Sequence, residues 1–202
     1  MIVSDLHSAL QPYVQAAPKG QVFVLVDTNT HAKCMPILAK VLADVSYETI
    51  VIPAGEEHKT LATVEQIWHY LYEHHATRQA VLINLGGGMV TDLGGFAAAT
   101  FMRGLRYVNI PTSLLAMVDA SSGGKTGFNY QGVKNMIGCF AQPEQTLIYL
   151  PLLDTLPAKQ WLSGYAEMLK HGLLDNTEHW NKVLALDVND AKCPISSALL
   201  AE

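Results

Sequence analysis

The sequence predicts an α/β fold: a Rossmann-like parallel sheet domain followed by the start of an all-helical domain. Short apolar runs alternate with segments of helical spacing before residue 150, and such alternation builds right-handed βαβ units around a parallel sheet. After about residue 150, prolines and a glycine punctuate a mainly helical stretch. We therefore expect an α/β domain at 1–150 and the beginning of a helical domain at 151–202, which is too short for an independent core.

Each expected element is predicted by its own pattern. Short apolar runs predict strands at 21–27, 49–53, 80–85 and 107–111, and the run at 21–27 predicts a strand buried on both faces. Apolar residues at helical spacing predict helices at 31–43, 60–75, 89–101 and from 157 or 158 through 171. Ligands of parallel sheets bind outside the carboxyl ends of the strands. The residues that directly follow the strands, and so mark a candidate site, are Asp27, Gly55–Glu56, Gly86–Gly88 and Thr112–Ser113.

The composition is that of an ordinary globular protein, with 202 residues, 50% of them hydrophobic, and a formal net charge of −5. No long basic run occurs, so we expect no nucleic-acid partner, and the basic residues within 103–134 suit a small anionic ligand. The three cysteines, Cys34, Cys139 and Cys193, are scattered, which is typical of a reducing cytoplasm and predicts no disulfide framework. The apolar segment 82–102 is broken by glycines and polar residues, so we expect no membrane span.

The triple glycine Gly86–Gly88 allows two interpretations. It could form only a tight turn between a strand and a helix. It could also hold a pyrophosphate on free backbone N–H groups at the helix start, where the helix dipole favours negative charge. The segment does not match G-x-G-x-x-G, so it is not a simple Rossmann fingerprint.

The segment 118–127 carries glycines, Asp119 and Lys125 in one turn. Its end resembles a P-loop, but that motif needs a glycine at the position of Asp119, which excludes a nucleotide triphosphatase. The remaining alternatives are a surface loop with an ion pair and a ligand site. The proximity of Lys134 and Asn135 favours the site.

Two further carboxylates have open interpretations. Glu56 and Lys59 could form an exposed helical ion pair, or they could reach cofactor hydroxyls. Glu167, taken alone, is a solvated helix carboxylate, because a catalytic zinc needs three protein ligands and only His171 lies nearby on the same expected helix face.

Together these segments resemble the 3-dehydroquinate synthase family of the shikimate pathway. The resemblance covers about residues 50–175 and rests on segments 86–92, 101–104, 111–115, 118–126, 134–138, 155–157 and 164–172. It implies conversion of a sugar phosphate, 3-deoxy-arabino-heptulosonate 7-phosphate, to 3-dehydroquinate and phosphate. It also implies NAD, which is reduced only transiently, and a divalent metal, Zn²⁺ or Co²⁺, acting as a Lewis acid.

The resemblance implies roles residue by residue. The residues implied along NAD, from adenosine through pyrophosphate to nicotinamide, are Asp27, Asn29, Glu56, Lys59, Gly87, Gly88, Met89, Asp92, Thr112 and Ser113. Those implied where nicotinamide meets substrate are Asp119, Lys125, Lys134 and Asn135, with Leu152 and Thr155 closing over the cofactor. The implied catalytic set is Asp119, Lys125, Asn135, Lys170 and Arg103, and the implied metal ligand is Glu167.

The chain departs from the family pattern in places. Ser113 stands where threonine is commoner, Ser122 replaces a common valine, and Val133 stands where glycine often precedes the second lysine. The family takes two histidine metal ligands from a later region, so we expect a C-terminally truncated chain that binds NAD weakly and lacks turnover by itself. The family also implies a homodimer. The alternatives are another NAD-dependent sugar-phosphate cyclase and a non-catalytic NAD-binding fragment.

Overall fold

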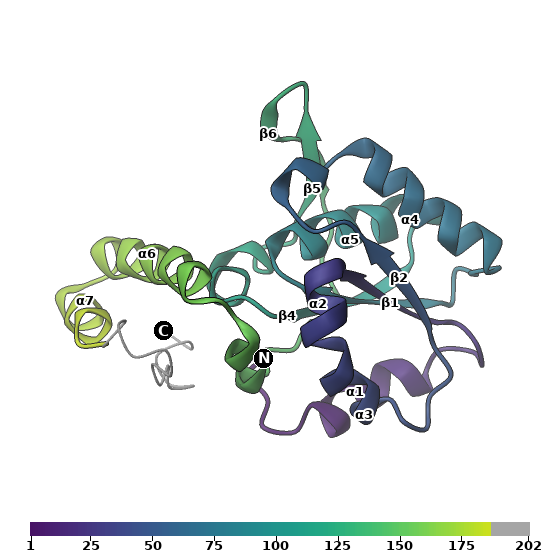
Figure 1. The fold of residues 1–202 in the computed structure, drawn as a ribbon, viewed down its shortest axis with the longest axis horizontal. Helices are drawn as coiled ribbons and strands as arrows, with labels where there is room; N and C mark the ends of the chain where they lie inside the picture. The colour runs from purple at the N-terminus through teal and green to yellow at the C-terminus, as the bar shows by residue number, and fades with distance from the viewer. Residues whose placement is uncertain (187–202) are drawn as a thin grey trace.

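A computed structural model describes residues 1–186. At its centre lies a five-stranded sheet in the order β2-β1-β3-β4-β7, and every neighbouring pair of strands is parallel (Figure 1). The strands are β1 (Val22–Asp27), β2 (Glu48–Ile52), β3 (Val81–Gly86), β4 (Arg106–Pro111) and β7 (Gln145–Thr146). The predicted α/β class is confirmed, because the apolar runs form the buried strands of this sheet.

Helices cover both faces of the sheet. The elements α1 (Leu6–Gln15), α2 (Thr28–Lys33) and α3 (Met35–Val41) lie on one face, and α4 (Leu61–Glu73) and α5 (Gly88–Thr100) lie on the other (Figure 1). Each face has its own apolar cluster: Val24 and Ile83 point to one, Leu25 and Leu82 to the other. This alternation explains why β1 and β3 are continuous apolar runs.

The prediction of a single helix over 31–43 is wrong. The chain forms two short helices that meet at Cys34. The first helix begins earlier than expected, because Asp27 and Thr30 make a capping box at its N-terminus. Pro36, a residue type that favours the first turn of a helix, lies in the first turn of the second one.

A hairpin, β5 (Lys125–Tyr130) with β6 (Val133–Phe140), begins at the end of the glycine-rich turn expected over 118–127, and the sequence patterns predict no strand there. Gln131 and Gly132 join the two strands, and both have positive φ, 51° and 80°. Two such residues form the tight turn that suits the twist of a hairpin. The hairpin projects from the sheet on the side of α5 (Figure 1).

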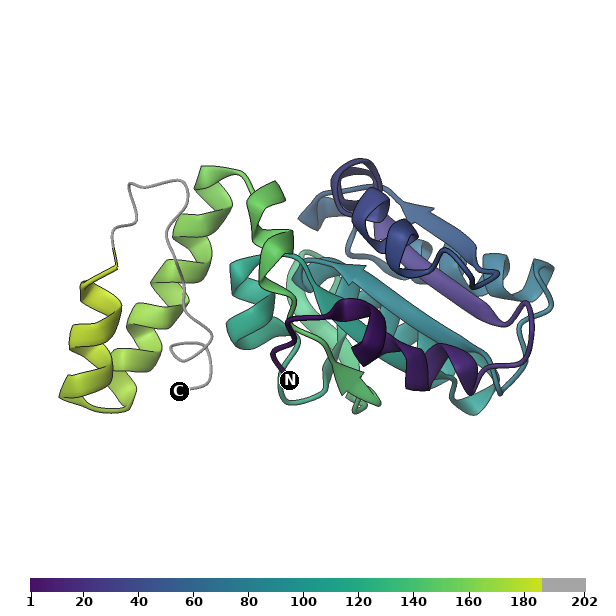
Figure 2. The ribbon, with the colours of Figure 1, turned by 90° about the horizontal axis from the view of Figure 1, so that it is seen from below.

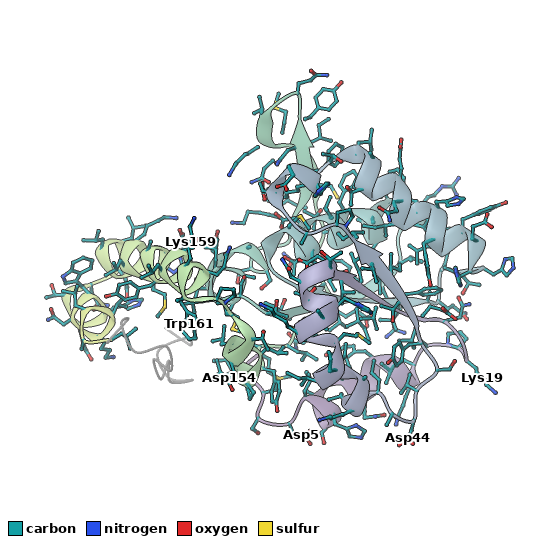
Figure 3. The ribbon with its side chains drawn as sticks, viewed as in Figure 1. Asp5, Lys19, Asp44, Asp154, Lys159 and Trp161 are labelled. Atoms are coloured by element: carbon teal, nitrogen blue, oxygen red, sulfur yellow. The ribbon has the colours of Figure 1, made fainter. Side chains whose placement is uncertain are left out.

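The last described elements are helical, as expected: α6 (Ala158–Leu174) and α7 (Thr177–Leu184). They lie to one side of the sheet (Figure 2) and share an apolar cluster with the π-helix η3 (Ala116–Ala120) and the 3₁₀ helix η4 (Leu150–Thr155). In Figure 3, Asp154 marks η4, and Lys159 and Trp161 mark the start of α6. The expected domain boundary at 150/151 stays a prediction. Residues 187–202 of the expected second domain, which include Cys193, lie outside the described part of the chain. In residues 1–186, no helix is long and apolar enough to cross a membrane.

Candidate functional site

A cavity of about 970 Å³ lies at the carboxyl edge of the sheet, where strands β1 to β4 end, and the hairpin and the start of α6 complete its wall. The implied site residues that line it are Asp27, Asn29, Glu56, Lys59, Gly87, Gly88, Met89, Asp92, Thr112, Ser113, Asp119, Lys125, Lys134, Asn135 and Thr155. Residues 108 positions apart in the sequence, from Asp27 to Asn135, therefore meet in one place. This is the position at which ligands bind in parallel sheets.

The triple glycine forms the junction of β3 and α5. Gly87 is the N-cap residue that directly precedes α5, and no side chain caps the helix start. The first N–H groups of a helix have no partner within the helix, and here they lie at the cavity. A Cβ on Gly88 would lie 2.9 Å from the Cβ of Ala120, so glycine also lets η3 pack against this helix start. The segment can therefore serve as a turn and as an anion site at the same time.

Lys59 is buried, with 4% of its surface exposed, and does not form the exposed helical pair with Glu56. Its Nζ donates to Asp92 Oδ2 at 2.5 Å and also to Asn135 Oδ1. Burial raises the pKa of the Asp92 carboxyl, and the Lys59 ammonium partly offsets this effect. One ammonium thus joins α5, the loop before α4, and the hairpin.

The Asp119–Lys125 pair is more open to water. Lys125 Nζ lies 3.0 Å from Asp119 Oδ1, and the side chains are 57% and 39% exposed, respectively. Both residues line the cavity, so the ion pair and the ligand site are compatible. The π-helix η3 carries Asp119, and π-helical turns are frequent at functional sites.

Four implied residues do not line the cavity. The Leu152 side chain is fully buried in an apolar core cluster, so only Thr155 of η4's implied pair faces the cavity. Arg103 is exposed at the end of the short helix after α5, with φ of 68°. Glu167 and Lys170 lie on α6 and pair with each other, with Oε1 and Nζ 2.5 Å apart.

The described residues do not by themselves fit a zinc ion. Within residues 1–186, no group of three or more histidine, cysteine, aspartate or glutamate side chains could hold a metal. Glu167 has one such neighbour, His171, whose Nε2 lies 3.4 Å from Glu167 Oε1. Two donors fall short of the three protein ligands of a catalytic zinc.

The hairpin supplies a part of the cavity wall that the sequence did not predict. Met136, Gly138, Cys139 and Phe140 line the cavity, but β6 is exposed along nearly its whole length and therefore lacks an apolar alternation. A local sequence signal for the turn is Gly132, because glycine readily adopts the positive φ that it has here.

Comparisons with known proteins identify relatives of this chain. The sequence model of the family described as "3-dehydroquinate synthase N-terminal" matches residues 49–163. A 3-dehydroquinate synthase of Parabacteroides distasonis is 42% identical over 202 residues, which are 100% of this chain and 57% of that relative. The chain thus spans about half the length of the curated relatives it matches.

Solved structures share the fold. A 2-epi-5-epi-valiolone synthase from Streptomyces hygroscopicus, with NAD⁺ and Zn²⁺ bound, has a TM-score of 0.76 and 34% identity, covering 84% of this chain and 48% of that one. A 2-deoxy-scyllo-inosose synthase has a TM-score of 0.81 and 23% identity, covering 99% of this chain and 55% of that one. At that lower identity the likeness concerns the fold alone.

Proposed function

The chain belongs to the 3-dehydroquinate synthase family, and from this premise we propose that it serves the conversion of 3-deoxy-arabino-heptulosonate 7-phosphate to 3-dehydroquinate and phosphate, with NAD as the cofactor. The observation that carries the proposal is the convergence of Asp119, Lys125 and Asn135 with Gly87–Gly88 on one cavity. An uncapped helix start suits a pyrophosphate, and lysines suit a phosphorylated, acidic substrate. The solved relative that holds NAD⁺ supports the same cofactor.

The cavity residues would divide the work by position. The free N–H groups of α5 beside Gly87 and Gly88 would bind the pyrophosphate. Asp27, the last residue of β1, and Glu56, which follows β2, would face the adenosine half. When bound, NAD supplies transient oxidation of the substrate's C5 hydroxyl. Lys125 and Lys134 would bind the substrate phosphate and stabilise its negative charge as it leaves, and the charge of Lys134 would also attract the phosphates of NAD. Asn135, Thr112 and Ser113 would orient the nicotinamide ring relative to the substrate.

The remaining implied residues lie outside the cavity lining and stay proposals. We propose Arg103 as a phosphate contact, Lys170 as a carboxylate contact and Glu167 as one ligand of Zn²⁺ or Co²⁺, supported by their match to the family segments at 101–104 and 164–172. Residues 1–186 bring together too few metal donors to hold this ion by themselves. We propose that the 202-residue chain by itself binds NAD and lacks turnover, and that it forms a homodimer.

Titration calorimetry with NAD tests the binding proposal. The wild-type chain should bind NAD saturably, and Gly88→Val should abolish binding, because its side chain occupies the space between α5 and Ala120. The exposed helix substitution Asn181→Ala on α7 is the matched control and should bind as the wild type does. Circular dichroism checks that each variant is folded. Absence of NAD binding by the folded wild-type chain would refute the proposal.

A phosphate-release assay with the heptulosonate phosphate tests the second part, and clear turnover by the 202-residue chain would contradict it. A second candidate function is cyclisation of a different sugar phosphate, favoured by the 34% identity to the 2-epi-5-epi-valiolone synthase. Binding of alternative sugar phosphates in the presence of NAD separates the two functions. Analytical ultracentrifugation tests the homodimer.

A further inference from the structure

The hairpin contains an irregularity at the cavity. Phe128 pairs with Ile137 and Tyr130 pairs with Val133, so Asn129 alone faces the three residues 134–136. Such a bulge interrupts the ladder of backbone hydrogen bonds and commonly redirects side chains next to functional sites. Here it carries Lys134 and Asn135, both of which line the cavity.

Asn135 adopts a left-handed backbone, with φ of 52°. Its N–H donates to the side chain of Asn129, with N and Oδ1 2.9 Å apart. Its own Oδ1 accepts from the buried Lys59 ammonium. Asn129 therefore fixes the backbone of Asn135, while Lys59 fixes its side chain.

The other end of the Asn129 amide reaches a different wall of the cavity. Its Nδ2 donates to Glu56 Oε1 at 2.9 Å, in the short helix η1 (Glu56–His58) that follows β2. Its backbone N–H donates to the Lys59 carbonyl oxygen at 2.8 Å. One asparagine thus connects β5, the bulge of β6 and the loop after β2, and each of the amide's two polar atoms has a distinct partner.

Asn129 itself does not line the cavity. From these contacts we propose that Asn129 is a positioning residue: it holds Asn135 and Lys134 of the bulge in a fixed place relative to Glu56. The consequence for binding rests on the proposed function, since Glu56 would lie at the adenosine end of NAD and Asn135 at its nicotinamide end. A change at Asn129 then alters both ends of the site without removing any group that touches the ligand.

The first test needs no ligand. Amide exchange of the Asn135 N–H, followed by NMR on the ¹⁵N-labelled chain, should accelerate about tenfold in Asn129→Ala, because the acceptor oxygen is lost. Asn129→Asp keeps an oxygen at that position and should retain the protection. Asn181→Ala on α7 is the matched control. Unchanged exchange in folded Asn129→Ala would overturn the proposal.

The second test measures NAD affinity in a double-mutant cycle. Asn129→Asp places a carboxylate against Glu56, and the lost hydrogen bond and the repulsion should weaken binding about tenfold. In the Glu56→Gln background the glutamine amide can donate to the new carboxylate. There, Asn129→Asp should weaken NAD binding by less than about twofold. Equal losses in both backgrounds would show that Asn129 does not act through Glu56.

The two tests separate the two proposals. If the wild-type chain fails to bind NAD, the proposed function fails, and the exchange of the Asn135 amide alone still decides whether Asn129 positions the bulge. If NAD binds and the exchange is unchanged, the positioning role fails and the proposed function stands.

Discussion

Removing the charge of Lys59 should destabilise the protein far more than removing the charge of Lys125. The Lys59–Asp92 side chains are only 5% and 15% exposed, with Nζ and Oδ2 2.5 Å apart. Lys59→Met leaves the Asp92 carboxylate buried without its cation, and breaking a buried pair in this way costs about 3–5 kcal/mol. At the lower end of that range, a chain of this size loses about 6–12 °C in melting temperature.

The same substitution at Lys125 is the control within the same cavity. The Lys125–Asp119 pair is largely exposed, and such pairs contribute about 0–1 kcal/mol, so Lys125→Met should lower the melting temperature by less than about 4 °C. Thermal unfolding followed by circular dichroism at pH 7 gives both values. Equal losses in the two variants would refute the reasoning, as would a double variant, Lys59→Met with Asp92→Asn, that is no more stable than Lys59→Met.

The pH dependence of Lys59→Met has a definite sign. Burial already raises the pKa of Asp92 above its ordinary value of 3.8 in the folded chain, and loss of the ammonium raises it further. The folded state then binds the Asp92 proton more tightly than the unfolded state does, so stability falls as pH rises above 3.8. The difference in melting temperature between Lys59→Met and wild type should therefore shrink as pH is lowered from 7 towards 5.

Three further substitutions or labels test the cavity wall. Gly127→Ala should lower the free energy of unfolding, measured in urea, by about 1–3 kcal/mol. The reason is that the Cβ of the alanine would collide with the Ile137 carbonyl oxygen. An unchanged urea midpoint would contradict the hairpin packing. Lys134→Gln should weaken NAD binding at low salt with no change in melting temperature, because the side chain is exposed; salt-independent affinity would count against an electrostatic role. In a Cys193→Ser background, a maleimide should label Cys139 before the buried Cys34, whose thiol pKa burial raises, and NAD should slow the labelling of Cys139.

The sheet could be predicted because its central strands are buried on both faces. Residues of β1 and β3 alternate between two apolar clusters, so the sequence shows a continuous apolar run with a clear end. The polar residue after each run, such as Asp27 or Thr112, then lies at the carboxyl edge by geometry alone. The site's location therefore followed from strand order without knowledge of any long-range contact.

The hairpin could not be predicted in the same way. Its outer strand is exposed at Val133, Met136 and Phe140. Because this strand has no buried face, its sequence does not alternate between apolar and polar residues. Its glycines are required by backbone contact across the pair, as at Gly138 against Thr126, which no local pattern reveals. Leu152 shows a different difficulty. The resemblance to the family implies that this residue closes over the cofactor, whereas its side chain lies in the apolar core, and the sequence alone does not reveal that burial.

Three of the four lysines that line the cavity, Lys59, Lys125 and Lys134, show why partners, rather than motifs, determine their chemistry. Lys59 is committed to Asp92, 33 residues away, and to Asn135, so its charge stabilises the hairpin and is not released to an anion without loss of that contact. Lys125 is paired with Asp119 in an exposed position, where an incoming phosphate can compete. Lys134 is exposed and forms no ion pair within residues 1–186, so an anion that enters the cavity meets its charge without displacing a carboxylate. The order in which the lysines can accept phosphate is therefore Lys134, Lys125 and Lys59, an order that follows from burial and pairing in the folded chain.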